Sequence, residues 1–468
     1  YVQKVINIGL KHCIALIKLH IFCKRRASVV FLFQVSLQVQ PIEPQTTLLL
    51  HETINKEEAT ENDDNLMKVE ETDGNMMEDI ENTEAIEVEV EKNDVTTTDV
   101  ETMDESCNIC YKWDNPLKLL YTATEEYQPT VLYENFTKGC QWSPDETCLL
   151  VPSEDFRIRI FDLPADLYSG KVCLDSPPKN FTSTVTVKEG GLIYDTCWYP
   201  FMNSWQPGTC CFLSTSRESP VHLWDAFTGE LRATYSPYNQ VDEVEHSISI
   251  QFINFAREIW AGFKSTLKTF DIERPGRHIN TIQFKNDFPN VTGLVSCIRE
   301  NPVMPGLVAF GTYSKCIGLY KDAPLCTFKA GSGVTQIEFS PCGMKLFSAV
   351  RRNNEFLCWD LRNPGAILYS IQGRQSNTNQ RIQFDLTSNG NQIVSGGTDG
   401  SISVWDTSKG TDQEENLCTT YNIKLSQDCI NGVNVHKRFP IIATSSGQRL
   451  NDDELERRDN SVRLWWAS

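Results

Sequence analysis

The strongest constraint on the fold is a short pattern that returns seven times after residue 130. Each copy alternates apolar and polar residues and closes on an aromatic residue, which is followed by Asp in five copies. The closing residues are Phe161, Trp224, Phe270, Tyr320, Trp359, Trp405 and Trp465. They are separated by 63, 46, 50, 39, 46 and 60 residues, a period of about 40–45 residues with insertions in two copies. Such a period predicts a core built from repeated units.

The units predict an all-β fold. Their alternation has period two, which indicates strands, and turn sequences such as SPDE (143–146) and SPCG (340–343) separate the strands. This is the WD40 signature, and seven copies predict a seven-bladed β-propeller with four-stranded blades, spanning 115–468. The sequence stops at Ser468, after the third strand of the seventh unit. The fourth strand of that blade is therefore expected from Leu117–Tyr121 or Thr130–Tyr133, because a closed ring leaves no unpaired sheet edge.

The charge is concentrated ahead of the repeats. Residues 51–106 carry 21 Asp and Glu and 3 Lys, whereas residues 107–468 have a net charge of only −6. A segment this acidic, with few apolar residues, cannot bury enough apolar surface to offset the conformational entropy that it would lose on folding. Residues 51–114 are therefore predicted to be a disordered acidic arm. The arm is either a solubilising tail or a regulated interaction or phosphorylation tail.

Residues 1–50 have a net charge of +5 and begin with Tyr rather than Met. Their apolar runs are too short to cross a bilayer, so no membrane association is expected. Four interpretations stay open: an artefact of gene prediction, a disordered segment, an amphipathic interaction helix or a targeting segment.

No catalytic motif stands out, and we expect neither an enzyme nor a cofactor. The number of cysteines is odd, 17, and most lie in apolar strand-like runs, which is typical of buried free thiols in a reducing compartment. The thiols expected to be buried are Cys140, Cys148, Cys197, Cys297, Cys316 and Cys358. The pair Cys107 and Cys110 lacks two further ligands at a suitable spacing, so no metal site is predicted.

One sector of the expected propeller is basic. In a propeller, the loops between the second and third strands and the links to the next blade lie on one face. In blades 4 to 6 these loops hold Lys315, Lys329, Arg351, Arg352, Arg374 and Arg381. Cationic groups suit phosphates, while Tyr313, Asn353, Asn354 and neighbouring amides at 377, 379 and 380 suit exposed bases. The sector therefore predicts an RNA-binding site, although solvated loop tips would give the same composition and Arg352 could instead pair with Glu355.

The opposite face is expected to be mildly acidic. Its loops contain Asp145 and Glu146, Asp162 and Asp166, and Glu414 and Glu415. Charge reversal at Asp145 and Glu146 would serve as a control for RNA binding on the basic sector.

Longer strings, in loops as well as strands, resemble the telomerase Cajal body protein family, also described as WD-repeat proteins antisense to p53. They are NFTKGCQWSPD from Asn135, IYDTCWY from Ile193, SRESPVHLWDAFTGELRA from Ser216, ERPGR from Glu273, CWDLR from Cys358, TNQRIQFDL from Thr378, VSGGTDGSISVWDT from Val394, DCINGVNVH from Asp428 and SSGQR from Ser445. The resemblance covers about residues 133–468. This sequence departs from the family in lacking an extended tail and in a short, charged insertion at 450–460.

The resemblance implies an RNA-binding adaptor that recognises the CAB box of small Cajal-body RNAs and carries them to Cajal bodies. It also implies telomerase RNA, H/ACA ribonucleoproteins and coilin-type proteins as partners, and a nuclear location, with the cytoplasm left open. The competing hypothesis is a scaffold that binds only proteins, such as a substrate receptor of a ubiquitin ligase. Such a scaffold would not need the basic sector.

Overall fold

The computed structural model describes residues 109, 111–129, 134–169, 172–409, 416–450 and 458–468. The expectations for residues 1–50, for most of the acidic arm, for Cys107 and Cys110, and for Glu414 and Glu415 lie outside the described residues. So does Thr130–Tyr133, one of the two candidate closing strands.

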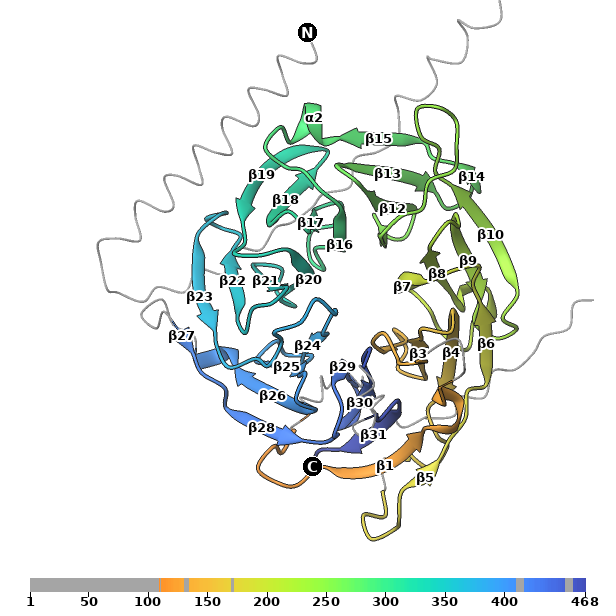
Figure 1. Ribbon diagram of the computed structural model, residues 1–468, viewed down its shortest axis with the longest axis vertical. Helices are drawn as coiled ribbons and strands as arrows, with labels where there is room; N and C mark the ends of the chain where they lie inside the picture. The colour runs from red at the N-terminus through yellow and green to blue at the C-terminus, as the bar shows by residue number, and fades with distance from the viewer. Residues whose placement is uncertain (1–108, 110, 130–133, 170–171, 410–415, 451–457) are drawn as a thin grey trace, which may run out of the picture. The chain divides into compact units, whose positions relative to one another are not determined.

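Seven antiparallel sheets follow one another around a central axis, as the repeats predict (Figure 1). Blade 1 contains β2 (Gln141–Trp142), β3 (Cys148–Pro152), β4 (Arg157–Asp162) and β6 (Val185–Lys188). Blade 2 contains β7 (Ile193–Trp198), β8 (Cys211–Ser216), β9 (Val221–Asp225) and β10 (Leu231–Ser236). Blade 3 contains β11 (Ser249–Ile253), β12 (Glu258–Phe263), β13 (Thr266–Asp271) and β15 (Asn280–Gln283). Blade 4 contains β16 (Val295–Glu300), β17 (Val308–Thr312), β18 (Cys316–Lys321) and β19 (Ala323–Lys329).

The ring continues in the same pattern. Blade 5 contains β20 (Val334–Phe339), β21 (Lys345–Val350), β22 (Phe356–Asp360) and β23 (Ile367–Ile371). Blade 6 contains β24 (Phe384–Leu386), β25 (Gln392–Gly396), β26 (Ser401–Asp406) and β28 (Tyr421–Lys424). Blade 7 contains β29 (Ile430–Val435), β30 (Ile441–Ser446), β31 (Val462–Trp466) and β1 (Lys118–Ala123). Short helical turns lie between strands: η1 (Glu125–Tyr127), η2 (Pro207–Thr209), α2 (Phe284–Asp287) and η3 (Thr407–Lys409).

The prediction of four strands per blade needs one correction. Blades 2, 5 and 7 each gain a fifth, two-residue strand: β14 (Gly276–Arg277), β27 (Asn416–Leu417) and β5 (Lys179–Asn180). Each pairs in parallel with the outer strand of its blade. All three lie between the third and fourth strands of the next blade around the ring, in a long connection for β5 and β27 and a short one for β14. Segments of two residues leave no mark on the repeat pattern.

The aromatic residues that mark the repeats stabilise the blades from inside. Phe161, Phe270 and Trp405 are fully buried, and buried apolar clusters fill the space between neighbouring blades, for example between blades 2 and 3. The indole of Trp359 also donates to Ser348 Oγ (2.8 Å) on the adjacent second strand. The prediction of buried, unpaired thiols is confirmed for all six cysteines.

Ring closure uses the predicted first candidate. Strand β1 pairs antiparallel with β31, from Lys118 opposite Trp466 to Ala123 opposite Val462, where the C-terminus meets β1 in Figure 1. The packed chain begins slightly before the expected boundary at 115. Tyr111 donates to the carbonyl oxygen of His436 (2.5 Å), and the Trp113 indole donates to Gln392 (3.0 Å). Both rings are buried and belong to the apolar cluster that residues of blades 6 and 7 form.

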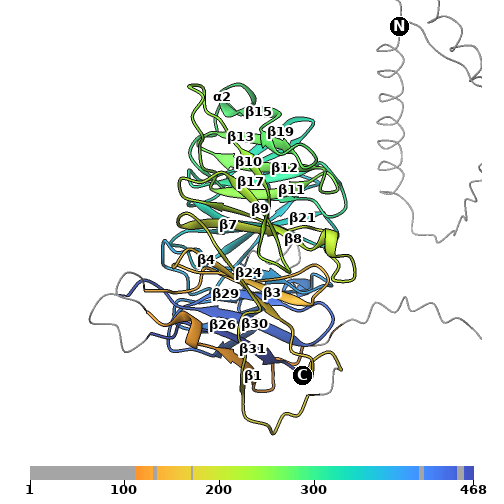
Figure 2. The same ribbon diagram turned by 90° about the vertical axis from the view of Figure 1, so that its right-hand side faces the viewer.

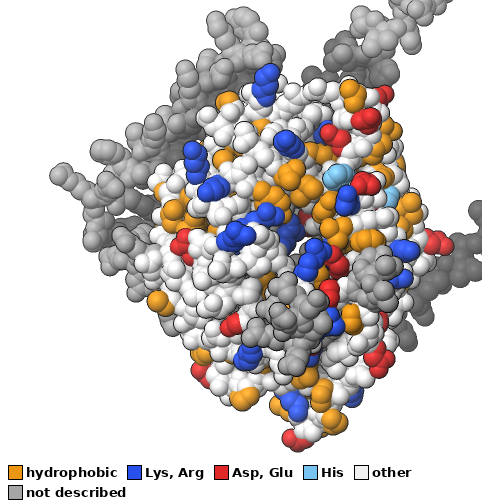
Figure 3. All heavy atoms as spheres, viewed as in Figure 1, with side chains coloured by type: hydrophobic (Ala, Val, Ile, Leu, Met, Phe, Trp, Pro, Cys, Tyr) orange, Lys and Arg blue, Asp and Glu red, His pale blue; other side chains and the backbone are white. Residues whose placement is uncertain are grey.

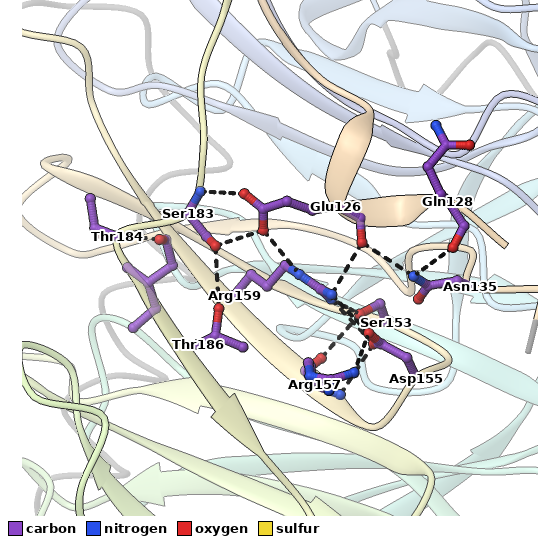
Figure 4. A network of polar contacts seen from close by, with 11 residues as sticks. Glu126, Gln128, Asn135, Ser153, Asp155, Arg157, Arg159, Ser183, Thr184 and Thr186 are labelled. Carbon is purple, nitrogen blue, oxygen red and sulfur yellow. Dashed lines mark hydrogen bonds and ion pairs between the residues drawn. The ribbon is translucent and has the colours of Figure 1, made fainter. Parts of the chain in front are cut away.

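A buried ion network fastens the link from β1 to β2 onto blade 1 (Figure 4). The guanidinium of Arg159 on β4 contacts both Asp155 (2.7 Å) and Glu126 (3.1 Å). Glu126 in turn accepts hydrogen bonds from the backbone N–H and hydroxyl of Ser183 (2.6 Å each). Removing Arg159 would take away the cation that Glu126 and the buried Asp155 share, and breaking a buried pair in this way costs about 3–5 kcal/mol. The network therefore locks the closing strand in place.

The two faces of the ring have different connections, seen from the side in Figure 2. We call the linker face the one that carries the loops between second and third strands and the links between blades. The hairpin face carries the other two sets of turns. Figures 1 and 3 view the linker face.

Candidate RNA-binding face

A cavity of about 890 Å³ lies along the axis of the ring, lined by side chains of the innermost strands and of several linker-face loops. In Figure 3, Lys and Arg side chains surround its opening and spread over blades 4 and 5, where acidic side chains are scarce. This is the sector that the loop composition predicts to be basic.

The opening carries a stacked pair of side chains. The guanidinium carbon of Arg351 lies 3.5 Å from the centroid of the Tyr313 ring. Backbone hydrogen bonds hold both loops, from Tyr313 N–H to Leu294 and from Arg351 N–H to Gly333. Arg351 Nε is buried and has no hydrogen-bond partner among the described residues. The pair therefore presents a planar cation and an aromatic ring, and the Nε–H group of Arg351 remains able to donate a hydrogen bond.

Lys315 and Lys329 lie side by side on blade 4. Cys316 pairs with Lys329 across β18 and β19, and the backbone N–H of Ala330 donates to the carbonyl of Lys315 (2.8 Å). Both lysines are exposed, and neither is found in an ion pair within the described part of the chain. Both ammonium groups are therefore available to an anionic ligand such as a nucleic-acid backbone.

In the loop 351–355, several polar side chains form hydrogen bonds within the protein. Asn353 donates to Glu355 (2.8 Å), and Asn354 Oδ1 accepts from the backbone N–H of Ser376 (3.1 Å). Arg352 is exposed in the left-handed region, with φ of 51°. It does not pair with Glu355, whose second oxygen accepts from Gln372 (2.8 Å). The cation of Arg352 is thus available, whereas the two amides are partly used by the loop itself.

Arg381 projects into the cavity and joins three blades. It donates to the backbone carbonyl of Ser296 on blade 4 (2.6 Å) and pairs with Asp195 on blade 2 (3.2 Å). Burial alone would lower the pKa of Arg381, but Asp195, Tyr313 and Cys297 together outweigh burial and raise that pKa. Arg381 therefore stays charged and braces the opening from inside.

Arg374 corrects the sequence prediction, because it is not on the surface. It is 1% exposed and lies over the Phe356 ring, 4.6 Å from its centroid. It donates to the carbonyl of Ile382 (2.5 Å) and to Ser395 Oγ (3.2 Å), and burial lowers its pKa to about 9. The link between blades 5 and 6 folds inward here, so Arg374 supports the loop and cannot reach an RNA phosphate.

Sequence reasoning missed a second aromatic pair at the opening. Tyr194 lines the cavity and stacks on His246, with ring centroids 5.7 Å apart and planes inclined by 28°. Arg449 and Lys138 also line it, and both pair with Glu154 (2.8 and 2.7 Å). Tyr194 lies in the IYDTCWY string, but nothing in the sequence indicates that a residue of the next link would stack on it.

Two carboxylates, Glu146 and Asp385, line the cavity together with Lys437 of the hairpin face. Glu146 is 4% exposed on its side chain, accepts from the backbone N–H of Lys437 (2.9 Å), and has its pKa raised by burial to about 7. Asp385 is half-buried, and desolvation raises its pKa to about 6. Asp145 is bound by Ser204. Asp145 and Glu146 are therefore unsuitable as the expected control, because charge reversal there would break these structural contacts.

Comparison with known proteins places the repeats in a family. The WD domain, G-beta repeat family model matches residues 370–406, which run from β23 to the end of β26. Within the described residues, no helix is long and apolar enough to cross a membrane.

Curated relatives carry a more specific name. Telomerase Cajal body protein 1 of Mus musculus is 39% identical over 357 residues, covering 71% of this chain and 66% of the relative. The Homo sapiens protein of that name is 40% identical over 335 residues, covering 71% and 60%. The Drosophila melanogaster homologue is 41% identical over 340 residues, covering 70% and 60%. The chain thus spans about 60–66% of the length of these relatives. Over this span it is confirmed as a relative of the telomerase Cajal body protein family.

Proposed function

We propose that this protein is an RNA-binding adaptor that recognises the CAB box of small Cajal-body RNAs and delivers them to Cajal bodies. The observation that carries the proposal is the Tyr313–Arg351 stack beside the available cations of Lys315, Lys329 and Arg352. Telomerase RNA is a further cargo where the organism uses it, because the relatives' name contains telomerase. Nuclear location, the small Cajal-body ribonucleoproteins and coilin-type partners belong to the same proposal.

The chemistry of the opening favours single-stranded RNA. Exposed bases of a hairpin loop stack on aromatic rings and on guanidinium planes, and each such stack contributes about 1–3 kcal/mol. Tyr313, Arg351, Tyr194 and His246 offer such planes at one opening. The lysines lie beside them on blade 4, where a backbone leaving the opening would pass. A folded loop of a few nucleotides fits this arrangement better than a duplex does.

The test is affinity for a CAB-box hairpin RNA, measured at several salt concentrations. Arg351→Ala with Arg352→Ala should weaken binding at least tenfold and lower the salt slope by up to about 2, one for each lost phosphate contact. The matched control is Arg257→Ala with Arg274→Ala, two exposed arginines on the hairpin face. Equal binding by the first variant and wild type would overturn the placement of RNA on the linker face.

The protein-only scaffold remains the second candidate, because the WD repeat model by itself implies no ligand. The two candidates differ in one observation. Small RNA should co-purify with the wild-type chain, disappear after nuclease treatment, and be depleted with the Arg351/Arg352 variant. Proteins that co-purify unchanged in the absence of any RNA would support the scaffold instead.

A further inference from the structure

The hairpin face of blades 1 and 2 presents an unusual group of exposed aromatic side chains. Trp205, in the loop between β7 and β8, is 93% exposed. Phe201 in the same loop, Phe227 in the turn after β9 and Tyr168 after β4 are each about half exposed. A tryptophan left almost wholly in water marks a surface that another molecule covers.

The loop that carries Trp205 is held rigidly. The preceding residue, Ser204, donates both its N–H (2.7 Å) and its hydroxyl (2.6 Å) to Asp145 of blade 1. The N–H of Trp205 itself donates to Asn203 Oδ1 (3.0 Å). Trp205 is therefore exposed on an ordered loop, not on a frayed one. A side chain held in this way loses little conformational entropy when a partner binds.

Arg232 joins this loop to the neighbouring turn. Its guanidinium donates to the carbonyls of Gly208 (2.7 Å) and Pro207 (2.8 Å) and pairs with Asp225 (2.7 Å). Asp225 also accepts from the backbone N–H of Phe227 (2.8 Å). The two turns therefore move as one body, with Phe227 beside the loop of Phe201 and Trp205.

Blade 1 extends the same surface. Thr147 shares a hydrogen bond with Ser204 (2.8 Å), and its carbonyl accepts a long bond from the Tyr168 hydroxyl (3.5 Å). Tyr168 is thus linked through Thr147 to the residue before Trp205. We call the surface formed by Tyr168, Phe201, Trp205 and Phe227 the aromatic platform.

The charges around the platform are one-sided. Lys179 is paired with Asp166, and Arg232 with Asp225. Two carboxylates beside the platform, Asp162 and Glu230, are exposed. Asp162 precedes Leu163, whose N–H donates to the carbonyl of Thr147, and Glu230 ends the turn that carries Phe227. Neither forms an ion pair within the described residues. Lys179 and Arg232 thus lie in ion pairs, whereas the exposed carboxylates Asp162, Asp175 and Glu230 form none within the described residues.

We propose that the aromatic platform binds an arginine- or lysine-containing segment of a partner protein. Indole and phenyl faces attract guanidinium and ammonium groups, and the unpaired carboxylates favour the same charge. An RNA would meet negative charge here without a compensating cation. Because the platform lies on the face opposite the proposed RNA site, both ligands can be bound at once, and this inference does not rest on the RNA proposal.

The probe is a fluorescently labelled twelve-residue peptide of Gly and Ser with four Arg, and its binding to the full chain is followed by anisotropy. Trp205→Ala should weaken binding at least fivefold, and Asp162→Lys with Glu230→Lys should do the same. Leu325→Ala, an exposed apolar residue on blade 4, is the matched control and should have no effect. The acidic arm is identical in all variants, so any affinity that it contributes cancels.

A second measurement locates the contact directly. Carbodiimide joins a lysine version of the peptide to nearby carboxylates, and mass spectrometry should find the link at Asp162 or Glu230. Links confined to residues 51–106, or equal anisotropy for Trp205→Ala and wild type, would overturn the proposal. So would dimers of the wild-type chain that Trp205→Ala dissociates, because the occupant would then be a second copy. Binding of the peptide should persist in the Arg351/Arg352 variant, which separates this inference from the RNA site.

Discussion

The basic sector of the linker face and the aromatic platform of the hairpin face both contain aromatic groups, but they differ in the sign of their unpaired charges. Both place aromatic groups in rigid loops at the surface, Tyr313 on one side and Trp205 on the other. Around Tyr313 the unpaired charges are cations, and around Trp205 they are carboxylates. In both proposals aromatic surface would supply affinity, so the unpaired charge beside it would select the class of ligand.

The largest expected effect tests the boundary of the basic sector. Arg374→Ala should lower the free energy of unfolding by about 3 kcal/mol, because it leaves a cavity and two buried acceptors without a donor. RNA affinity per folded molecule should stay unchanged. Chemical denaturation and RNA titration of the same sample measure both quantities. If Arg374→Ala had normal stability but weakened RNA binding, Arg374 would have to contact the RNA, contrary to this expectation.

Charge reversal on blade 4 sharpens the contrast between the faces. Lys315→Glu with Lys329→Glu should reduce RNA affinity roughly thirtyfold at low salt, because two phosphate contacts become repulsions. Binding of the arginine peptide to the platform should not weaken. Arg257→Glu with Arg274→Glu changes the net charge equally on the other face and should affect RNA far less. Equal losses in the two variants would mean that only net charge matters.

A carboxylate that lines the cavity, Glu146, predicts a pH dependence. Burial raises the pKa of Glu146 to about 7 from its ordinary value of 4.5. Between these values the folded protein binds more protons than the unfolded chain, so stability falls as the pH rises. From pH 6 to pH 8 this group should contribute a loss of about 1.4 kcal/mol. Glu146→Gln keeps an acceptor for the Lys437 N–H and should lack that decline. Parallel stability–pH curves for the two proteins would contradict the assignment.

The smallest expected effect separates stacking from charge at the opening. Arg351→Lys keeps the positive charge but loses the planar group over Tyr313, so RNA affinity should fall about threefold with an unchanged salt slope. Tyr313→Phe keeps the ring and should bind nearly as wild type. Unchanged RNA affinity for Arg351→Lys would show that Arg351 acts through its charge rather than through stacking.

Features that repeat along the chain could be predicted, and features that depend on the path of single loops could not. The seven aromatic closures predicted the blades, and the missing strand predicted that β1 would pair with β31. Loop charge identified the side of the ring where Arg351, Lys315 and Lys329 lie. It failed for Arg374, because composition does not tell whether a link folds inward. It missed the Tyr194–His246 stack and the exposure of Trp205, since apolar residues in a loop can equally be buried.

The pairing of β1 with β31 also sets a time scale for synthesis. Asn460 donates to the carbonyl of Tyr127 across a separation of 333 residues. A ribosome adding about 5–20 residues per second needs on the order of tens of seconds to make the chain between them. Throughout that interval β1 has left the ribosome with an unpaired edge, and six blades stand beside an open gap. An edge of this kind recruits other strands, so the yield of the ring should depend on what shields β1 while translation continues.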